Sequence, residues 1–362
     1  MLLLILVENP LKLLMSTVVI LSHPFSFVGM FLSGKKQCNA VPPLNKQTIV
    51  ITGASSGIGR ATAIELARYN CKLILAARNK AALDEVADVC NRLGANAMVV
   101  VTDVTDAQAI TTLGKDACAF GKSIDAWINV AGVGLLGDFS SIPLEVHQQV
   151  IQTNLIGYIN GAYAALPCFK KQGYGTIVNV NSAGGFLPMP YSVAYTASKY
   201  GVRGYAEALQ GELGDYPNIN VCNVYPGFVD TPGPSHAGNY TGKKLKPMPP
   251  VVSPTRVASE IVALLQNPRE HVLIGSAAYG ARVGSIFAPR FTRWVMTQIS
   301  RNYFKHAEPE AVTNGNLQHA THLHYQISGG YTSKKVTKHN LKLGGIAGAA
   351  AVTAFWLVRK FV

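Results

Sequence analysis

Short runs of aliphatic and β-branched residues alternate with longer amphipathic stretches from residue 48 to residue 230. The apolar runs predict strands, at 48–52, 72–77, 97–102, 125–130, 175–181 and 219–225. The stretches between them predict helices, at 57–70, 79–93, 106–120, 143–171 and 191–214. A final strand is predicted at 271–274. Such alternation indicates an α/β fold, with one parallel sheet, right-handed crossovers and helices on both faces.

The sequence that follows these strands has a different pattern. Glycine and proline are frequent from 227 to 254, which predicts a loop that stays outside the sheet and covers the site. Residues 307–340 are polar with little periodicity and predict an extended connector. Residues 287–305 have a helical stripe of apolar side chains, made of Phe291, Trp294, Val295, Ile299 and Tyr303. This helix either packs on the sheet domain or lies at a membrane interface.

Both ends of the chain are apolar. Residues 11–34 fit a signal anchor, a cleaved signal peptide, or an upstream extension from a misassigned start, with cleavage the weakest fit because no small-x-small site is present. The run 343–358 has sixteen uncharged residues, slightly fewer than the roughly 20 that span a bilayer. We therefore expect a catalytic domain with flanking extensions, divided as 1–44, 45–285, 286–340 and a membrane segment at 341–362.

Composition and charge favour contact with a membrane. Hydrophobic residues make up 48% of the chain and charged residues only 14%. Of the net charge of +13, +12 lies between residues 241 and 362, and no nucleic-acid-binding motif accompanies it. Four lysines on the catalytic side of the membrane segment place the catalytic domain in the cytoplasm (Lys334, Lys335, Lys338, Lys342). The six cysteines are scattered, which predicts free thiols in a reducing compartment.

A glycine-rich turn follows the first predicted strand. Gly53, Gly57 and Gly59 allow a tight turn, close approach of the backbone to a pyrophosphate, and close packing of helix on strand. The helix that follows offers its amide-rich N-terminus to the phosphates. After the second strand, the slot for an acidic residue that would bind a ribose 2′-hydroxyl holds alanines, and Arg78 follows. Because a guanidinium can bind a 2′-phosphate, and Arg60 adds a second positive charge, the pattern favours NADP(H) over NAD(H).

A second group of residues suits acid–base chemistry. Tyr195 and Lys199 are four residues apart in a predicted helix, so an ammonium can lie under a phenol. The lysine and a positively charged oxidised nicotinamide would both favour the phenolate. Ser182 ends the strand at 175–181, at the carboxyl edge where doubly wound sheets bind ligands. Taken singly, each feature also fits a solvated helix face or an ordinary serine at a strand end.

The order and spacing of these motifs resemble the short-chain dehydrogenase/reductase family over residues 46–280. The resemblance implies a single Rossmann-like, doubly wound domain and the catalytic set Asn154, Ser182, Tyr195 and Lys199. Asn154 would hold a water in a proton relay to the lysine. The cofactor-binding positions implied by the turn and by the resemblance include Tyr195 and Lys199 together with Gly53, Ser55, Ser56, Gly57, Ile58, Gly59, Arg60, Arg78, Asp103, Val104, Asn129, Ala131, Gly132, Pro226, Gly227, Val229 and Thr231. Val130 stands where the family usually has a second asparagine.

The implied reaction interconverts a hydrophobic carbonyl and its alcohol by hydride transfer, with Tyr195 as the acid or base. Apolar residues are expected near the substrate, namely Val133, Phe186, Leu187, Met189, Tyr191 and Phe228. The sequence leaves open which carbonyl is used and in which direction, and it is compatible with a homo-oligomer. The alternative is a non-catalytic NADP(H)-binding scaffold or sensor that recruits partners through its basic C-terminal third.

Overall fold

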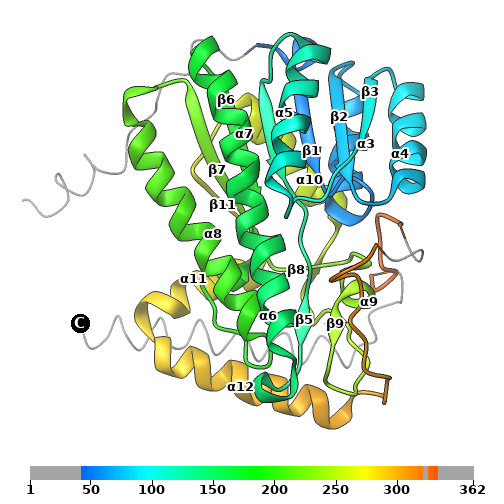
Figure 1. Cartoon of the computed structure of the whole chain (residues 1–362). Coiled ribbons are helices and arrows are strands. Elements are labelled where there is room, and N and C mark those ends of the chain that lie inside the picture. Colours follow the sequence, from blue (N-terminus) through cyan, green and yellow to red (C-terminus); the bar gives the residue numbers. More distant parts are fainter. Residues whose placement is uncertain (1–41, 321–324, 333–362) are drawn as a thin grey trace, which may run out of the picture. The chain divides into compact units, whose positions relative to one another are not determined.

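A computed structural model describes residues 42–320 and 325–332, all of them in the unit of the chain that begins at Ala40. Seven strands form one sheet in the order β11-β7-β6-β4-β1-β2-β3, and every neighbouring pair is parallel. The strands are β1 Thr48–Thr52, β2 Lys72–Ala77, β3 Asn96–Val101, β4 Ala126–Asn129, β6 Gly175–Val180, β7 Ile219–Pro226 and β11 His271–Ile274. The expected parallel α/β sheet is confirmed (Figure 1).

Helices cover both faces of the sheet. One face carries α3 (Gly57–Ala67), α4 (Lys80–Arg92) and α10 (Pro254–Gln266). The other carries α5 (Ala107–Gly121), α7 (Gly157–Gln172) and α8 (Val193–Glu212). This layering explains why the strands are continuous apolar runs, since both faces of a parallel sheet are buried.

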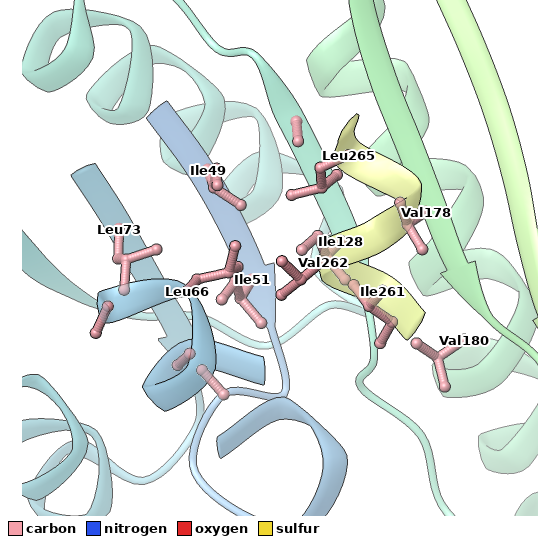
Figure 2. Close-up of a cluster of buried hydrophobic side chains, with 14 of the residues drawn as sticks. Ile49, Ile51, Leu66, Leu73, Ile128, Val178, Val180, Ile261, Val262 and Leu265 are labelled. Carbon is pink, nitrogen blue, oxygen red and sulfur yellow. The ribbon is translucent and has the colours of Figure 1, made fainter. Parts of the chain in front are cut away.

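Two hydrophobic clusters form because successive side chains of a strand point to opposite faces. Ile49 and Ile51 of β1 belong to the cluster under α3, α4 and α10, whereas Val50 belongs to the cluster under the other three helices. Figure 2 shows the first cluster, in which side chains of α10 lie against side chains of β1, β4 and β6. The core therefore fixes the carboxyl ends of the strands, where the candidate site lies.

Differences from the sequence expectation occur within two long helices. The stretch predicted as one helix at 143–171 consists of α6 (Leu144–Ile151), a π-helical segment at Gln152–Ile156, and α7. The next helix begins at Val193 instead of 191, because Tyr191 has a left-handed backbone with φ of 65°. A left-handed residue cannot belong to a right-handed helix.

The segment at 227–254 lies outside the main sheet, as predicted, but it is not without structure. It contains β8 (Phe228–Val229), α9 (Gly233–His236), β9 (Gly238–Asn239) and β10 (Val251–Val252). β8 pairs with β10, and β9 pairs with β5 (Leu135–Leu136). Two helices follow β11, α11 (Ser276–Phe287) and α12 (Pro289–His306), the second of which matches the predicted amphipathic helix.

The described part of the predicted connector is docked on the protein. Thr313 and Pro309 make β-bridges with Asn239 and Lys243, so the stretch after α12 lies beside β9 and α9 (Figure 1, orange). Sequence periodicity did not indicate this, because the contacts are tertiary hydrogen bonds that need no repeating apolar pattern.

Two expectations concern the ends of the chain, which the structure does not describe. The apolar run at 11–34 and the predicted membrane segment at 343–358 lie outside the described residues. Among the residues that the structure does describe, no helix is both long and apolar enough to cross a bilayer. No disulfide joins the cysteines in this part of the chain, as expected.

Candidate active site

The structure brings three of the four predicted catalytic residues to one cavity. Ser182 follows the carboxyl end of β6, and Tyr195 and Lys199 lie one turn apart in the first half of α8. All three line a cavity of about 450 Å³ at the carboxyl edge of the sheet. The Ser182 hydroxyl forms a hydrogen bond with the Tyr195 phenol and accepts one from the Gly184 backbone N–H at 3.0 Å.

Lys199 is buried, and among the residues that the structure describes no carboxylate pairs with it. Its Nζ donates to the backbone oxygen of Val180 at 3.2 Å and lies 5.2 Å from the ring centre of Tyr158 and 5.7 Å from that of Tyr195. Burial lowers the pKa of Lys199 from 10.5 to about 8, because a charged ammonium loses its hydration. The lysine is thus held in place by aromatic rings and one carbonyl.

Burial shifts the pKa of Tyr195 in the direction opposite to that of Lys199. Burial raises the pKa of its phenol, and the hydrogen bond with Ser182 only partly offsets this. Without a bound cofactor, the neutral phenol is therefore favoured, and the proximity of Lys199 does not by itself produce a phenolate. A neutral phenol is the form that donates a proton.

Asn154 lies in the π-helical segment and does not line the cavity. Its side-chain amide pairs with the backbone of Val133, accepting from the N–H at 2.7 Å and donating to the C=O at 2.9 Å. It also donates to the Ser198 hydroxyl at 3.2 Å. In the structure, Asn154 therefore ties the loop after β4 to the helix that carries Lys199.

The glycine turn after β1 is as tight as the sequence suggested. A Cβ on Gly59 would lie 2.1 Å from the Gly53 backbone oxygen, and one on Gly53 would lie 2.7 Å from the Ala131 backbone. Gly53 and Gly57 also have positive φ angles of 71° and 54°. A larger residue at Gly59 would push α3 away from the turn after β1, and one at Gly53 would push the turn away from the loop after β4.

The arginines assigned to a 2′-phosphate already have partners. Arg78 lines the cavity, but its guanidinium donates to the backbone oxygens of Asn316, Leu317 and Gln318. Arg60 forms an ion pair with Glu85 at 2.6 Å and donates to the Tyr325 backbone oxygen at 2.7 Å. Arg60 does not line the cavity.

Most other predicted cofactor positions face the same cavity. Those that line it are Gly53, Ser55, Ser56, Ile58, Asp103, Val104, Ala131, Gly132, Pro226, Gly227, Val229 and Thr231. Gly57, Gly59 and Asn129 do not. Asn129 is fully buried and accepts from the Trp127 indole at 3.0 Å while donating to Asn179 at 3.0 Å, so it braces the sheet.

The cavity also has apolar lining residues. Of the six residues expected near the substrate, Val133, Met189 and Phe228 line it. Phe186 instead packs on Tyr225 with ring centres 4.5 Å apart, and Tyr191 packs on Phe304. Residues that the sequence did not assign complete the apolar lining, namely Leu136, Pro190, Leu245, Pro247, Met248, Tyr303 and Phe304.

The family model for the short chain dehydrogenases matches residues 47–238, which is more than half of the chain. The chain belongs to this family. A 7-strand parallel sheet with helices on both faces and a cavity at its carboxyl edge agree with that membership.

Similarity to individual proteins covers more of the chain than the family model does. An uncharacterised oxidoreductase, YxnA of Bacillus subtilis, is 32% identical over 269 residues, which cover 73% of this chain and 75% of the bacterial one. Human estradiol 17-beta-dehydrogenase 11 is 27% identical over 291 residues, which cover 80% of this chain and 93% of the human one. In structure, the chain is similar to an alcohol dehydrogenase from Thermococcus sibiricus complexed with 5-hydroxy-NADP, with a TM-score of 0.56, 26% identity, and 63% and 95% of the two chains covered.

Family membership makes the protein an oxidoreductase that uses a nicotinamide cofactor and a small-molecule substrate. The residues present fit such a cofactor. The turn packs so closely at Gly53 and Gly59 that a Cβ at either position would collide with backbone, and Gly53, the serines and Asp103 line the cavity. These polar groups suit phosphates and ribose hydroxyls, and the apolar lining residues suit an uncharged reactant.

Sequence reasoning missed two residues that position the dehydrogenase site. Tyr158 is fully buried under Lys199, and its hydroxyl donates to the same Val180 oxygen at 2.8 Å. Asn181 accepts from the Ser182 N–H and donates to the Lys199 backbone oxygen. The asparagines within the β-prone run before Ser182 were the available signal for Asn181, because a buried strand amide needs a hydrogen-bond partner.

Proposed function

We propose that the protein is an NADP(H)-dependent oxidoreductase that interconverts a hydrophobic carbonyl and its alcohol. The observation that carries this proposal is the convergence of Ser182, Tyr195 and Lys199 in one cavity that is also lined by apolar side chains. A nicotinamide cofactor, when bound, supplies or accepts the hydride.

The residues of the chain manage the proton. The Ser182 hydroxyl, which accepts from the Gly184 N–H and contacts the Tyr195 phenol, would hold the substrate oxygen. Tyr195 donates its proton to the developing alkoxide in reduction and removes one in oxidation. Lys199 favours the phenolate that reduction leaves behind, because an ammonium nearby stabilises a negative charge.

Two observations support the substrate class and the cofactor choice. Apolar side chains in the lining of the cavity favour an uncharged, hydrophobic reactant, and a relative named for estradiol oxidation agrees with that class. Arg78 lines the cavity where no acidic residue follows β2, which favours a 2′-phosphate over a free 2′-hydroxyl. The structural neighbour was solved with an NADP derivative.

We also propose that the protein binds membranes, with its catalytic domain in the cytoplasm. Apolar side chains of α11 and α12 are exposed next to one another in the sequence, at Tyr279, Val283, Ile286, Phe287, Phe291 and Trp294. Arg290 and Arg293 are exposed among them. An apolar surface with interspersed arginines suits an anionic bilayer, and the other side of α12 lines the cavity through Ser300, Tyr303 and Phe304.

The experiment that tests the enzymatic proposal incubates the protein with NADPH and a panel of apolar ketones and aldehydes. The loss of NADPH absorbance measures turnover. The Tyr195→Phe variant should lose nearly all turnover and still bind NADPH, whereas Tyr163→Phe, a change at an exposed tyrosine of α7, should be normal. Binding of NADPH without turnover of any panel member would favour the alternative, a non-catalytic NADP(H) sensor or scaffold.

A further inference from the structure

The C-terminal strap, defined here as residues 313–320 and 325–332, lies on the groups that the sequence assigned to cofactor phosphates. Backbone oxygens of Asn316, Leu317 and Gln318 accept from the Arg78 guanidinium. The Gln326 backbone oxygen accepts from the Gly57 N–H at 3.0 Å, at the N-terminus of α3. The strap therefore places peptide carbonyls where the glycine turn offers donors for phosphate.

Further contacts extend along the same edge of the site. Arg60 donates to the Tyr325 backbone oxygen at 2.7 Å, and the Asn79 side chain donates to the Tyr325 hydroxyl at 2.8 Å. Asn316, Ala320 and Tyr325 also line the cavity together with Ser55 and Asp103. The strap is thus a side of the cavity itself and not a remote surface segment.

Asp230 anchors the C-terminal part of the strap, residues 328–332. Its buried carboxylate accepts from the Ser328 hydroxyl at 2.8 Å, from the Tyr331 N–H at 2.9 Å, and from both the N–H and the hydroxyl of Thr332. Burial tends to raise the pKa of Asp230, but these hydrogen bonds outweigh it and lower the pKa below the ordinary value. None of Asp230, Ser328 and Thr332 lines the cavity.

The N-terminal part of the strap is anchored independently. Thr313 makes a β-bridge with Asn239, the Asn316 N–H donates to the His236 backbone oxygen at 2.9 Å, and Leu317 is fully buried. Both described parts of the strap are therefore held in place, one on Arg78 and the other on Gly57 (Figure 1, orange).

We infer that the strap is the outer wall of the cofactor site, and that NADP(H) enters only after the strap separates from Arg78, Arg60 and Gly57. Carbonyl and phosphate oxygens are both acceptors, so a strap carbonyl and a phosphate compete for the same N–H hydrogens. This inference rests on the proposed cofactor use. It assigns to Arg78 a second role, in which its hydrogen bonds to the strap hold the strap against the site.

The test weakens the anchor without touching the cavity. In the full chain, the double variant Ser328→Ala/Thr332→Val removes two hydroxyl donors to Asp230 and leaves the size of both side chains nearly unchanged. The matched control is Ser285→Ala/Thr297→Val, because these hydroxyls donate only within α11 and α12. Stopped-flow fluorescence measures association and dissociation of NADPH, and hydrogen exchange with mass spectrometry follows the amides of Gly57, Tyr331 and Thr332 without cofactor.

We expect the association rate constant for NADPH to rise at least tenfold in the strap variant, since each of the two hydrogen bonds removed is made to a charged group and corresponds to a tenfold change or more. The dissociation rate constant should stay near that of the wild type, because the strap has already left these N–H groups when NADPH is bound. The three amides should exchange faster, and the control should match the wild type. Faster exchange with an unchanged association rate would overturn the wall as a barrier to entry. Unchanged exchange would overturn the anchoring by Asp230. A wild-type chain that binds no NADPH would instead refute the proposed function, whatever the exchange experiment gives.

Discussion

Replacement of Asn154 by alanine tests whether this asparagine holds the site together. The side chain is fully buried and makes three hydrogen bonds, two to the Val133 backbone and one to Ser198. Each such bond contributes about 1 kcal/mol, and buried backbone groups left without a partner add to the loss. We expect Asn154→Ala to lower the free energy of unfolding by about 3–4 kcal/mol.

That loss should be visible in thermal melts. For a domain of this size, each kcal/mol lowers the midpoint by about 2–4 °C, so the midpoint should fall by roughly 6–16 °C. The matched control is Asn160→Ala, which removes a single hydrogen bond from the Asn160 side chain to the Val104 backbone oxygen and should cost about 1 kcal/mol.

The comparison has a clear negative outcome. If Asn154→Ala is no less stable than Asn160→Ala while turnover falls sharply, the side chain does not brace Val133 and Ser198 in solution. The water-holding role implied by the family resemblance would then be its main task.

Three further predictions address charge, cofactor and membrane. Because Lys199 has a pKa of about 8 when folded and 10.5 as its ordinary value, the unfolded chain binds more protons between these pH values. Unfolding free energy should therefore rise by about 3 kcal/mol from pH 8 to 10.5 in wild type relative to Lys199→Met, measured in urea, and parallel curves would contradict the burial argument. Arg78→Ala should weaken NADPH binding by about 1.5–3 kcal/mol and leave NADH nearly unchanged in titrations, whereas equal losses would exclude a 2′-phosphate role. The full chain should sediment with anionic vesicles, and a chain ended near residue 335 should shift towards the supernatant while keeping its activity. Phe287→Glu/Trp294→Glu should weaken residual binding of the shortened chain, and Tyr163→Glu should not, so equal effects would exclude the α11–α12 surface.

The sequence predicted what repeats along the chain. Runs such as 48–52 are buried on both faces of the sheet, so their positions can be predicted from where apolar residues cluster along the chain. The spacing of Tyr195 and Lys199 likewise predicts one helix face, and the structure has both residues lining one cavity.

Contacts between distant, polar and non-periodic segments could not be predicted in this way. The strap reaches Arg78 through backbone oxygens some 240 residues away in sequence, and any residue type supplies such an oxygen. Tyr158 lies under Lys199 because α7 crosses the sheet beside α8, which depends on the packing and not on local spacing. The same limit applies to Arg78. Its residue type suggested a guanidinium available to bind a phosphate, but its carbonyl partners could be found only from the folded structure.

The most direct measurement uses NADPH carrying deuterium at the transferable position of its nicotinamide ring and an apolar ketone that the protein turns over. The account predicts that wild type gives an alcohol with one deuterium on the carbinol carbon, detected by mass spectrometry, and that Tyr195→Phe binds the same NADPH but forms almost no product. Product without deuterium at that carbon, or full turnover by Tyr195→Phe, would contradict the assignment of this cavity as a site of hydride transfer with Tyr195 as its proton donor.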